Sequence, residues 1–130
     1  LKRKFEYAAT VMPKPVFTLQ PGAEVGLVTI GGCDAAVREA ADRLRDQGVT
    51  VDVMRIRAFP FGSEVREFFD AHDRNFVIEQ NRDAQLRALL AVELGIPRDS
   101  MTSILDYGGM PLTAKVVVDG VLRHLAKVPA

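Results

Sequence analysis

The chain has 130 residues, which is enough for one domain with a buried core and too few for two. Hydrophobic residues make up 48% of it and charged residues 26%, so the composition is that of an ordinary globular protein. The 17 basic residues balance the 17 acidic ones. This neutrality argues against nucleic acid as the main partner, because nucleic-acid binding depends on neutralising phosphates.

No apolar run approaches the roughly 20 residues that span a bilayer, and no secretory signal opens the chain. Cys33 is the single cysteine, which excludes an internal disulfide and a metal site built from several cysteines. His72 and His124 lie far apart without metal-ligand spacing. We therefore expect a cytoplasmic protein without a membrane or metal role. Because the chain begins with Leu1, we also expect a processed product or a segment of a longer chain.

Residues 1–15 differ from the rest of the chain. Four lysines and arginines against one glutamate give this stretch a local charge of +3, and prolines follow at positions 13, 15 and 21. A basic start punctuated by prolines is typical of a linker or arm, and the alternative is the frayed end of a complete protein. The globular domain is expected over residues 16–127.

Strand-like and helix-like patterns alternate along this domain. Short apolar runs predict five strands, at 16–19, 25–30, 49–56, 75–79 and 101–105. Apolar stripes at helical spacing predict four helices, around 36–44, 65–69, 86–94 and 114–125. We expect Ser63 and Asn81 to cap the second and third helices and Pro111 to begin the fourth. Gly48 and Gly95 are expected to end the first and third.

This alternation predicts an α/β fold, with a mostly parallel sheet covered by helices on both faces. Ligands and partner domains of such sheets meet the carboxyl ends of the strands. Three segments follow predicted strands and are therefore expected at one edge: the Gly31-Gly32 turn, the stretch from Glu79 to Gln85, and the Gly108-Gly109 loop.

Glu79 stands at the end of a predicted buried strand and is followed by the amides of Asn81 and Gln85. A carboxylate there could serve as a general base, but its neighbours include no second titratable partner. We expect Glu79 instead to accept hydrogen bonds from loop N–H groups or to pair with an arginine of another domain.

The Gly31-Gly32 turn opens a helix, where backbone N–H groups can hold an anion. It lacks the Gly-x-Gly-x-x-Gly fingerprint, and Asp34 would repel an anion, so a simple tight turn is the preferred interpretation. Cys33 beside it could be a nucleophile with a lowered pKa, but the sequence places no base within reach. We expect a small, partly buried side chain. For the Gly108-Gly109 loop, a contact role and a plain glycine turn both remain open.

Four segments together resemble one known module: Gly26–Gly32, Arg55–Phe61, Phe76–Leu86 and Tyr107–Pro111. They are similar to the C-terminal domain of the α subunit of 2-oxoacid:ferredoxin oxidoreductases, and the 2-oxoglutarate (oxoglutarate synthase) branch is the most similar. The likeness covers about residues 13–126, and residues 76–86 are its most specific part. One departure is Phe61, where relatives often carry a second proline.

The resemblance implies a domain like the C-terminal domain of transketolase. Such a domain is a three-layer α/β/α sandwich around a five-stranded mixed sheet with one antiparallel edge strand, for which Val16–Leu19 is the candidate. The family's enzymes decarboxylate a 2-oxoacid oxidatively to an acyl-CoA and reduce ferredoxin. They use thiamine diphosphate, Mg, an iron–sulfur cluster and CoA. These cofactors bind other domains, so the resemblance carries no catalytic, cofactor-binding or metal residue onto this chain.

We therefore expect a non-catalytic assembly domain that contacts the rest of the α subunit and the β subunit. The residues expected to line the contact edge lie at strand ends or in the loops after them: Gly31, Gly32, Glu79, Asn81, Gln85, Gly108 and Gly109. One alternative is a stand-alone small-molecule or anion-binding α/β module with its anion at Gly31-Gly32. Another is an enzyme that depends on Cys33.

Overall fold

The computed structural model describes residues 1–127. The helices are α1 (Lys2–Val11), α2 (Asp34–Asp46), α3 (Ser63–Asp70), α4 (Gln85–Leu94) and α5 (Ala114–Ala126). The strands are β1 (Val16–Thr18), β2 (Val25–Ile30), β3 (Val51–Ile56), β4 (Arg74–Glu79) and β5 (Met101–Leu105). Short 3-10 helices, Gly31–Cys33 and Arg98–Ser100, precede α2 and β5.

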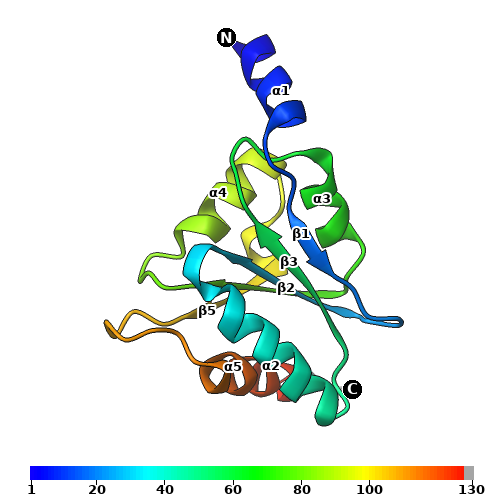
Figure 1. The fold of residues 1–130 in the computed structure, drawn as a ribbon, viewed down its shortest axis with the longest axis vertical. Helices are drawn as coiled ribbons and strands as arrows, with labels where there is room; N and C mark the ends of the chain where they lie inside the picture. The colour runs from blue at the N-terminus through cyan, green and yellow to red at the C-terminus, as the bar shows by residue number, and fades with distance from the viewer. Residues whose placement is uncertain (128–130) are drawn as a thin grey trace.

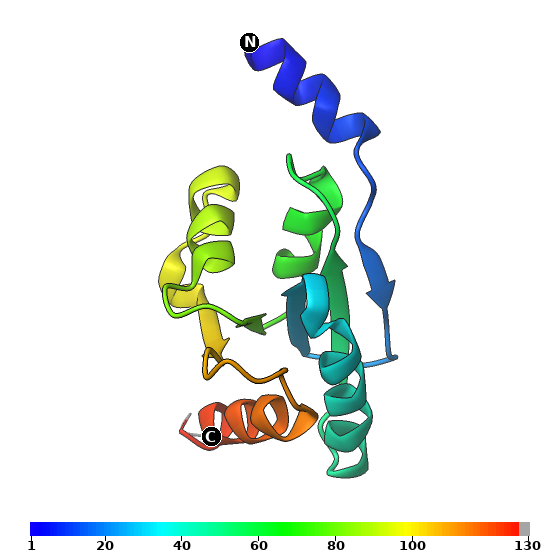
Figure 2. The same cartoon turned by 60° about the vertical axis from the view of Figure 1, so that its left-hand side comes forward.

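The strands form one sheet in the order β1-β3-β2-β4-β5 (Figure 1). β1 runs antiparallel to β3, and all the other neighbouring pairs are parallel. Helices α3 and α4 cover one face of the sheet, and α2 and α5 cover the other (Figure 2). The predicted α/β sandwich with one antiparallel edge strand is confirmed.

The central strand β2 explains why both faces must be covered. Its side chains alternate in direction, so Leu27 packs in the cluster beneath α2 and α5, while Val28 packs beneath α3 and α4. Both side chains are fully buried. A strand that is apolar on both sides reads as a continuous hydrophobic run, which is the pattern of residues 25–30.

Three expected helix starts differ from the structure. Gly62 precedes α3, and Ser63 is its first helical residue rather than its cap. α5 begins at Ala114, three residues after Pro111, and the side chain of Thr113 accepts a hydrogen bond from the Val116 N–H at 3.4 Å. Asn81 precedes the cap position of α4, which Ala84 occupies. Gly48 and Gly95 follow helices in left-handed conformation, with φ of 82° and 65°, as expected of helix ends.

Residues 2–11 of the expected arm form the helix α1, which the sequence analysis did not predict. Within the described chain α1 has no buried residue, and it extends away from the body (Figures 1 and 2). The division of the chain at residue 15 stays a prediction. Within residues 1–127, no helix is long and apolar enough to cross a membrane.

A polar cluster connects the edge strand β1 with the helix layer that contains α3. Asp52 on β3 accepts hydrogen bonds from His72 Nε2 at 2.7 Å and from the Gln20 backbone N–H at 2.6 Å. The other ring nitrogen of His72 lies 2.6 Å from the carbonyl oxygen of Phe68. One carboxylate therefore joins the segment after β1, the strand β3 and the end of α3.

Removing this carboxylate should destabilise the fold. We expect Asp52→Ala to lower the free energy of unfolding by about 2–4 kcal/mol, because the buried His72 and the partly buried Gln20 N–H lose their acceptor. Urea unfolding followed by circular dichroism measures the loss. The control Asp42→Ala removes a carboxylate that is exposed on α2 and pairs only with Arg45, and it should change stability by less than about 0.5 kcal/mol. Equal losses in the two variants would contradict a structural role for the buried cluster.

Candidate contact surface at the carboxyl edge of the sheet

The three segments singled out in the sequence come together in the structure. They follow β2, β4 and β5, which are adjacent parallel strands, so their carboxyl ends share one edge. The Asp106 N–H donates to the Glu79 carbonyl at 3.0 Å and joins the ends of β4 and β5. Gln80 bridges the outer segments, because its amide oxygen accepts from Cys33 Sγ at 3.8 Å and its Nε2 donates to the Met110 carbonyl at 3.4 Å.

Glu79 is buried beneath this edge, with only 2% of its surface exposed. Its Oε1 accepts from the Leu86 N–H at 2.6 Å and from Asn81 Nδ2 at 2.9 Å, and its Oε2 accepts from the Arg87 N–H at 3.2 Å. The expectation that Glu79 accepts backbone hydrogen bonds is confirmed, although the donors belong to the first turn of α4. Burial leaves its carboxylate no access to a partner protein.

Glu79 and Asn81 together satisfy the start of α4. The first N–H groups of a helix have no acceptor within the helix. Asn81 Oδ1 accepts from the N–H of Gln85, at 3.1 Å, and Glu79 accepts from the next two. The first bond inside the helix then runs from Ala88 N–H to the Ala84 carbonyl, at 3.0 Å. A negative charge at this place is also favoured by the helix dipole.

The Gly31-Gly32 turn is a 3-10 helix with Gly31 at a φ of 66°. Burial raises the pKa of the Cys33 thiol above its ordinary value; the Thr29 hydroxyl opposes this, and the carboxylates of Glu79 and Asp106 raise it further. Cys33, at the end of the turn, therefore lies near negative charge, whereas Arg55 and Arg57 line the hollow beside Gly31. A raised thiol pKa also opposes the hypothesis of a Cys33 nucleophile.

Most of the seven expected contact residues are accessible. Gly31, Gly32, Gln85, Gly108 and Gly109 are exposed. Asn81 is half-buried, and Glu79 is buried.

Exposed apolar side chains at the same edge were not singled out in the sequence. Tyr107 is 62% exposed and Met110 75%, and Ile30, the last residue of β2, and Phe59, which follows β3, are also exposed. A shallow hollow of about 460 Å³ lies beside Tyr107 and Met110, and its lining also includes Gln80, Asp106, Gly109 and Pro111. The sequence signal that could have found them is Tyr107 and Met110 on either side of two glycines, since aromatic residues and methionine are enriched at interfaces.

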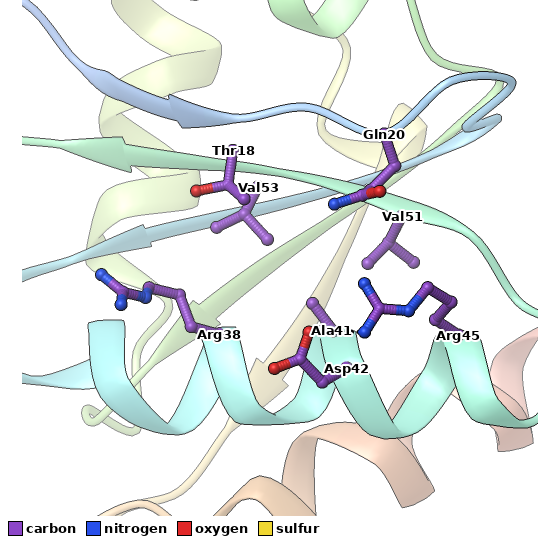
Figure 3. Close-up of a pocket in the computed structure, with 8 residues that line it drawn as sticks. All are labelled: Thr18, Gln20, Arg38, Ala41, Asp42, Arg45, Val51 and Val53. Atoms are coloured by element: carbon purple, nitrogen blue, oxygen red, sulfur yellow. Dashed lines mark ion pairs between the residues drawn. The ribbon is translucent and has the colours of Figure 1, made fainter.

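A second hollow of about 350 Å³ lies away from this edge, between β1 and α2 (Figure 3). Arg38 and Arg45 reach into it from α2, over a floor that includes Val53 of β3. Both arginines pair with carboxylates of their own helix, Arg38 with Asp34 at 3.7 Å and Arg45 with Asp42 at 3.2 Å. These are exposed surface pairs, and they leave the groove without a free cationic centre.

In the part of the chain that the structure describes, no group of three or more His, Cys, Asp and Glu side chains is placed to hold a metal ion. The carboxyl edge combines exposed glycines, apolar side chains and amides, and a buried carboxylate holds the adjoining helix.

No known family model matches the chain. A curated relative, "2-oxoacid:ferredoxin oxidoreductase 2, subunit alpha" of Aeropyrum pernix, is 33% identical over 129 residues. This match covers 95% of the present chain and 20% of the relative. The chain is similar to a segment of a 2-oxoacid:ferredoxin oxidoreductase α subunit. It spans about one fifth of the length of that relative.

Solved structures with the same fold include three that bear on this similarity. The 2-oxoglutarate:ferredoxin oxidoreductase of Magnetococcus marinus matches 92% of the chain and 21% of its own, with a TM-score of 0.80 and 24% identity. A split-gene transketolase matches 85% of the chain and 41% of its own, with a TM-score of 0.66 and 24% identity. The α chain of a probable 2-oxoacid ferredoxin oxidoreductase of Thermoplasma acidophilum matches 88% and 98%, with a TM-score of 0.60 and 22% identity.

At these identities the solved structures establish the fold alone. They confirm the expected likeness to transketolase. The relationship to 2-oxoacid:ferredoxin oxidoreductase α subunits rests on the curated relative and the residues quoted above.

Replacing Glu79 should lower the stability of the domain itself, and not only weaken a contact with a partner. We expect Glu79→Ala to lower the free energy of unfolding by about 2–4 kcal/mol, because two N–H groups of α4 lose their acceptor. Urea unfolding measures the loss. Asp83→Ala is the matched control, since Asp83 is an exposed carboxylate four residues away that pairs with Arg82. A Glu79→Ala variant as stable as the control would show that Glu79 does not hold α4.

Alkylation of Cys33 should require high pH. Because its thiol pKa is raised, the thiolate fraction at neutral pH is smaller than in a free cysteine. In the folded chain, we expect the reaction with iodoacetamide to reach half its maximal rate at a pH above ~8.5, the ordinary thiol pKa. In the chain unfolded in urea, the pH of half-maximal rate should fall back to about that pKa. Half-maximal reaction well below that pH in the folded chain would restore the hypothesis of a Cys33-dependent enzyme.

Proposed function

We propose that this chain is a non-catalytic assembly domain of a 2-oxoacid:ferredoxin oxidoreductase α subunit. The observation that carries the proposal is the 33% identity to such an α subunit over 95% of the chain. The whole enzyme would decarboxylate a 2-oxoacid oxidatively, form an acyl-CoA and reduce ferredoxin. The proposal includes the β subunit as a partner and a cytoplasmic location.

The 2-oxoacid that we propose is 2-oxoglutarate. Two observations support this choice: the segment from Phe76 to Leu86 resembles that branch of the family, and the 2-oxoglutarate:ferredoxin oxidoreductase with the same fold has 2-oxoglutarate, CoA and succinyl-CoA bound. Substrate contacts would lie in other domains of the enzyme.

The residues of this chain do not fit the cofactors of such an enzyme. Thiamine diphosphate presents a diphosphate, whereas the carboxylates of Glu79 and Asp106 lie close enough to the glycine turn to raise the pKa of the Cys33 thiol. The carboxylate of Glu79 is already occupied by the N–H groups of α4. Thiamine diphosphate, Mg, the iron–sulfur cluster and CoA are therefore assigned to the other parts of the enzyme in this proposal.

The carboxyl edge supplies the means of assembly. Gly31, Gly32, Gly108 and Gly109 have no side chains, so the backbone of a partner can approach closely. Tyr107 and Met110 protrude beside them and can insert into a partner's pocket, which is how exposed aromatic residues anchor interfaces. In this proposal Gln85 adds an exposed amide, while Glu79 and Asn81 act by positioning α4.

A stand-alone anion-binding module remains the alternative function. It would require the Gly31-Gly32 turn to accept an anion beside Asp34, whose carboxylate lies 3.9 Å from the Arg55 guanidinium. Asp34 thus competes with an anion for Arg55, although Arg55 and Arg57 both line the hollow beside Gly31. Binding of inorganic phosphate to the chain at micromolar affinity would favour this alternative.

Removing the apolar anchors should weaken assembly and leave the domain folded. We expect the double variant Tyr107→Ala, Met110→Ala to raise the apparent Kd for its partner subunits at least tenfold, a change of about 1.4 kcal/mol. Sedimentation velocity of the co-expressed enzyme measures assembly, and circular dichroism checks the fold. Val92→Ala is the matched control, because Val92 is 79% exposed on the outer side of α4. Normal assembly of the double variant would exclude this edge as the contact.

A further inference from the structure

Helix α1 carries an apolar seam that the described chain leaves largely exposed. Phe5 and Ala8 lie in the helix, and Leu1 and Met12 stand at its two cap positions. These residues recur at steps of four, three and four, the spacing of the core positions in a coiled coil. No residue of α1 is buried by residues 1–127, Phe5 is 51% exposed, and the helix stands clear of the body (Figures 1 and 2).

The basic residues of α1 gather at one end of the helix. Lys2, Arg3 and Lys4 occupy its first turn, and its last turn carries no basic residue. Positive charge therefore stands next to Phe5 of the seam.

The missing partner is defined by these same residues. Three positive charges against Glu6 leave α1 with a net charge of +2, so a complementary surface is acidic. Small alanines at positions 8 and 9 permit another helix to approach closely, as in helix-to-helix packing.

The position of α1 connects it with the candidate contact surface. β1 runs antiparallel, and its first residue, Val16, pairs with Arg55 near the carboxyl end of β3. α1 therefore leaves the domain at the same edge as two exposed apolar residues, Ile30 at the end of β2 and Phe59 after β3. The apolar seam is thus a continuation of that edge.

We propose that α1 is a docking helix that folds against a helix elsewhere in the enzyme assembly, one with an apolar stripe flanked by Asp and Glu. This inference rests on the proposed function, because it needs a larger assembly around the domain. Docking would couple the ordering of residues 2–11 to assembly, while the body of the domain is folded beforehand.

Hydrogen exchange in two states of the protein tests the proposal. The amides of residues 2–11 are followed by mass spectrometry in the purified 130-residue chain and in the assembly purified from the source cells. We expect rapid exchange in the chain alone and exchange at least about 100-fold slower in the assembly, since no residue of α1 is buried by residues 1–127. The amides of β2 serve as the internal control and should be protected in both.

Two variants separate the seam from the charge. Phe5→Glu places a carboxylate in the seam and should abolish the protection of α1 in the assembly. The matched control Thr10→Glu adds the same charge on the opposite side of the helix and should leave protection within about threefold of the wild type, as expected of a surface change. The triple variant K2E/R3E/K4E should weaken docking and reverse its dependence on salt.

Several results would overturn the proposal. Equal exchange of α1 in the two states would show that it does not dock. Dimerisation of the purified chain that is lost in Phe5→Glu would assign the seam to a second copy, and binding to vesicles containing anionic lipid would assign it to a membrane surface. Suppose that α1 stays protected in the assembly formed by Phe5→Glu, while the double variant Tyr107→Ala, Met110→Ala does not assemble. The proposal for α1 would then be wrong, and the proposed function of the domain would stand. Absence of any assembly in cells removes both proposals.

Discussion

The buried carboxylate of Glu79 is the constraint on which the carboxyl edge depends. A charged group with 2% exposure is tolerated in a protein only when its oxygens have partners. Here the partners are the first N–H groups of α4 and the amide of Asn81. The carboxylate gains the donors that it needs, and the first N–H groups of α4 gain the acceptors that a helix start lacks. The position of α4 is thereby determined from the end of β4 rather than from its own cap residue.

The same arrangement makes the edge a defined surface. The loop between β4 and α4 closes through Ala84, which is buried and adopts a left-handed φ of 51°. That conformation costs an alanine about 1–2 kcal/mol, so the loop keeps it only because the contacts of Glu79 and Asn81 hold both its ends. Gln80, in the same loop, joins the turn after β2 to the loop after β5. Three separate segments are therefore held in one relative position at this edge.

Most of the fold was predictable from sequence, because buried strands and amphipathic helices leave periodic patterns in residues 25–56 and 75–125. The helix starts at Ser63, Asn81 and Pro111 were predicted wrongly. Local cap rules consider neighbours in sequence, whereas the acceptors for α4 include a carboxylate seven residues before Leu86. The site was predictable only as a set of strand ends. Exposure of Tyr107 and burial of Glu79 depend on tertiary packing, which no local pattern records.

The antiparallel direction of β1 has a consequence for affinity. A polypeptide that continues before α1 would approach the domain at the carboxyl edge, where the candidate contact surface also lies. A domain tethered there meets that surface at an effective concentration in the millimolar range for a short flexible connection. A contact too weak to hold two free proteins together would then stay closed most of the time. Modest complementarity between the glycine turns and the partner would then be enough to keep the contact closed. Selection on this edge could favour the correct orientation of the two surfaces over tight binding.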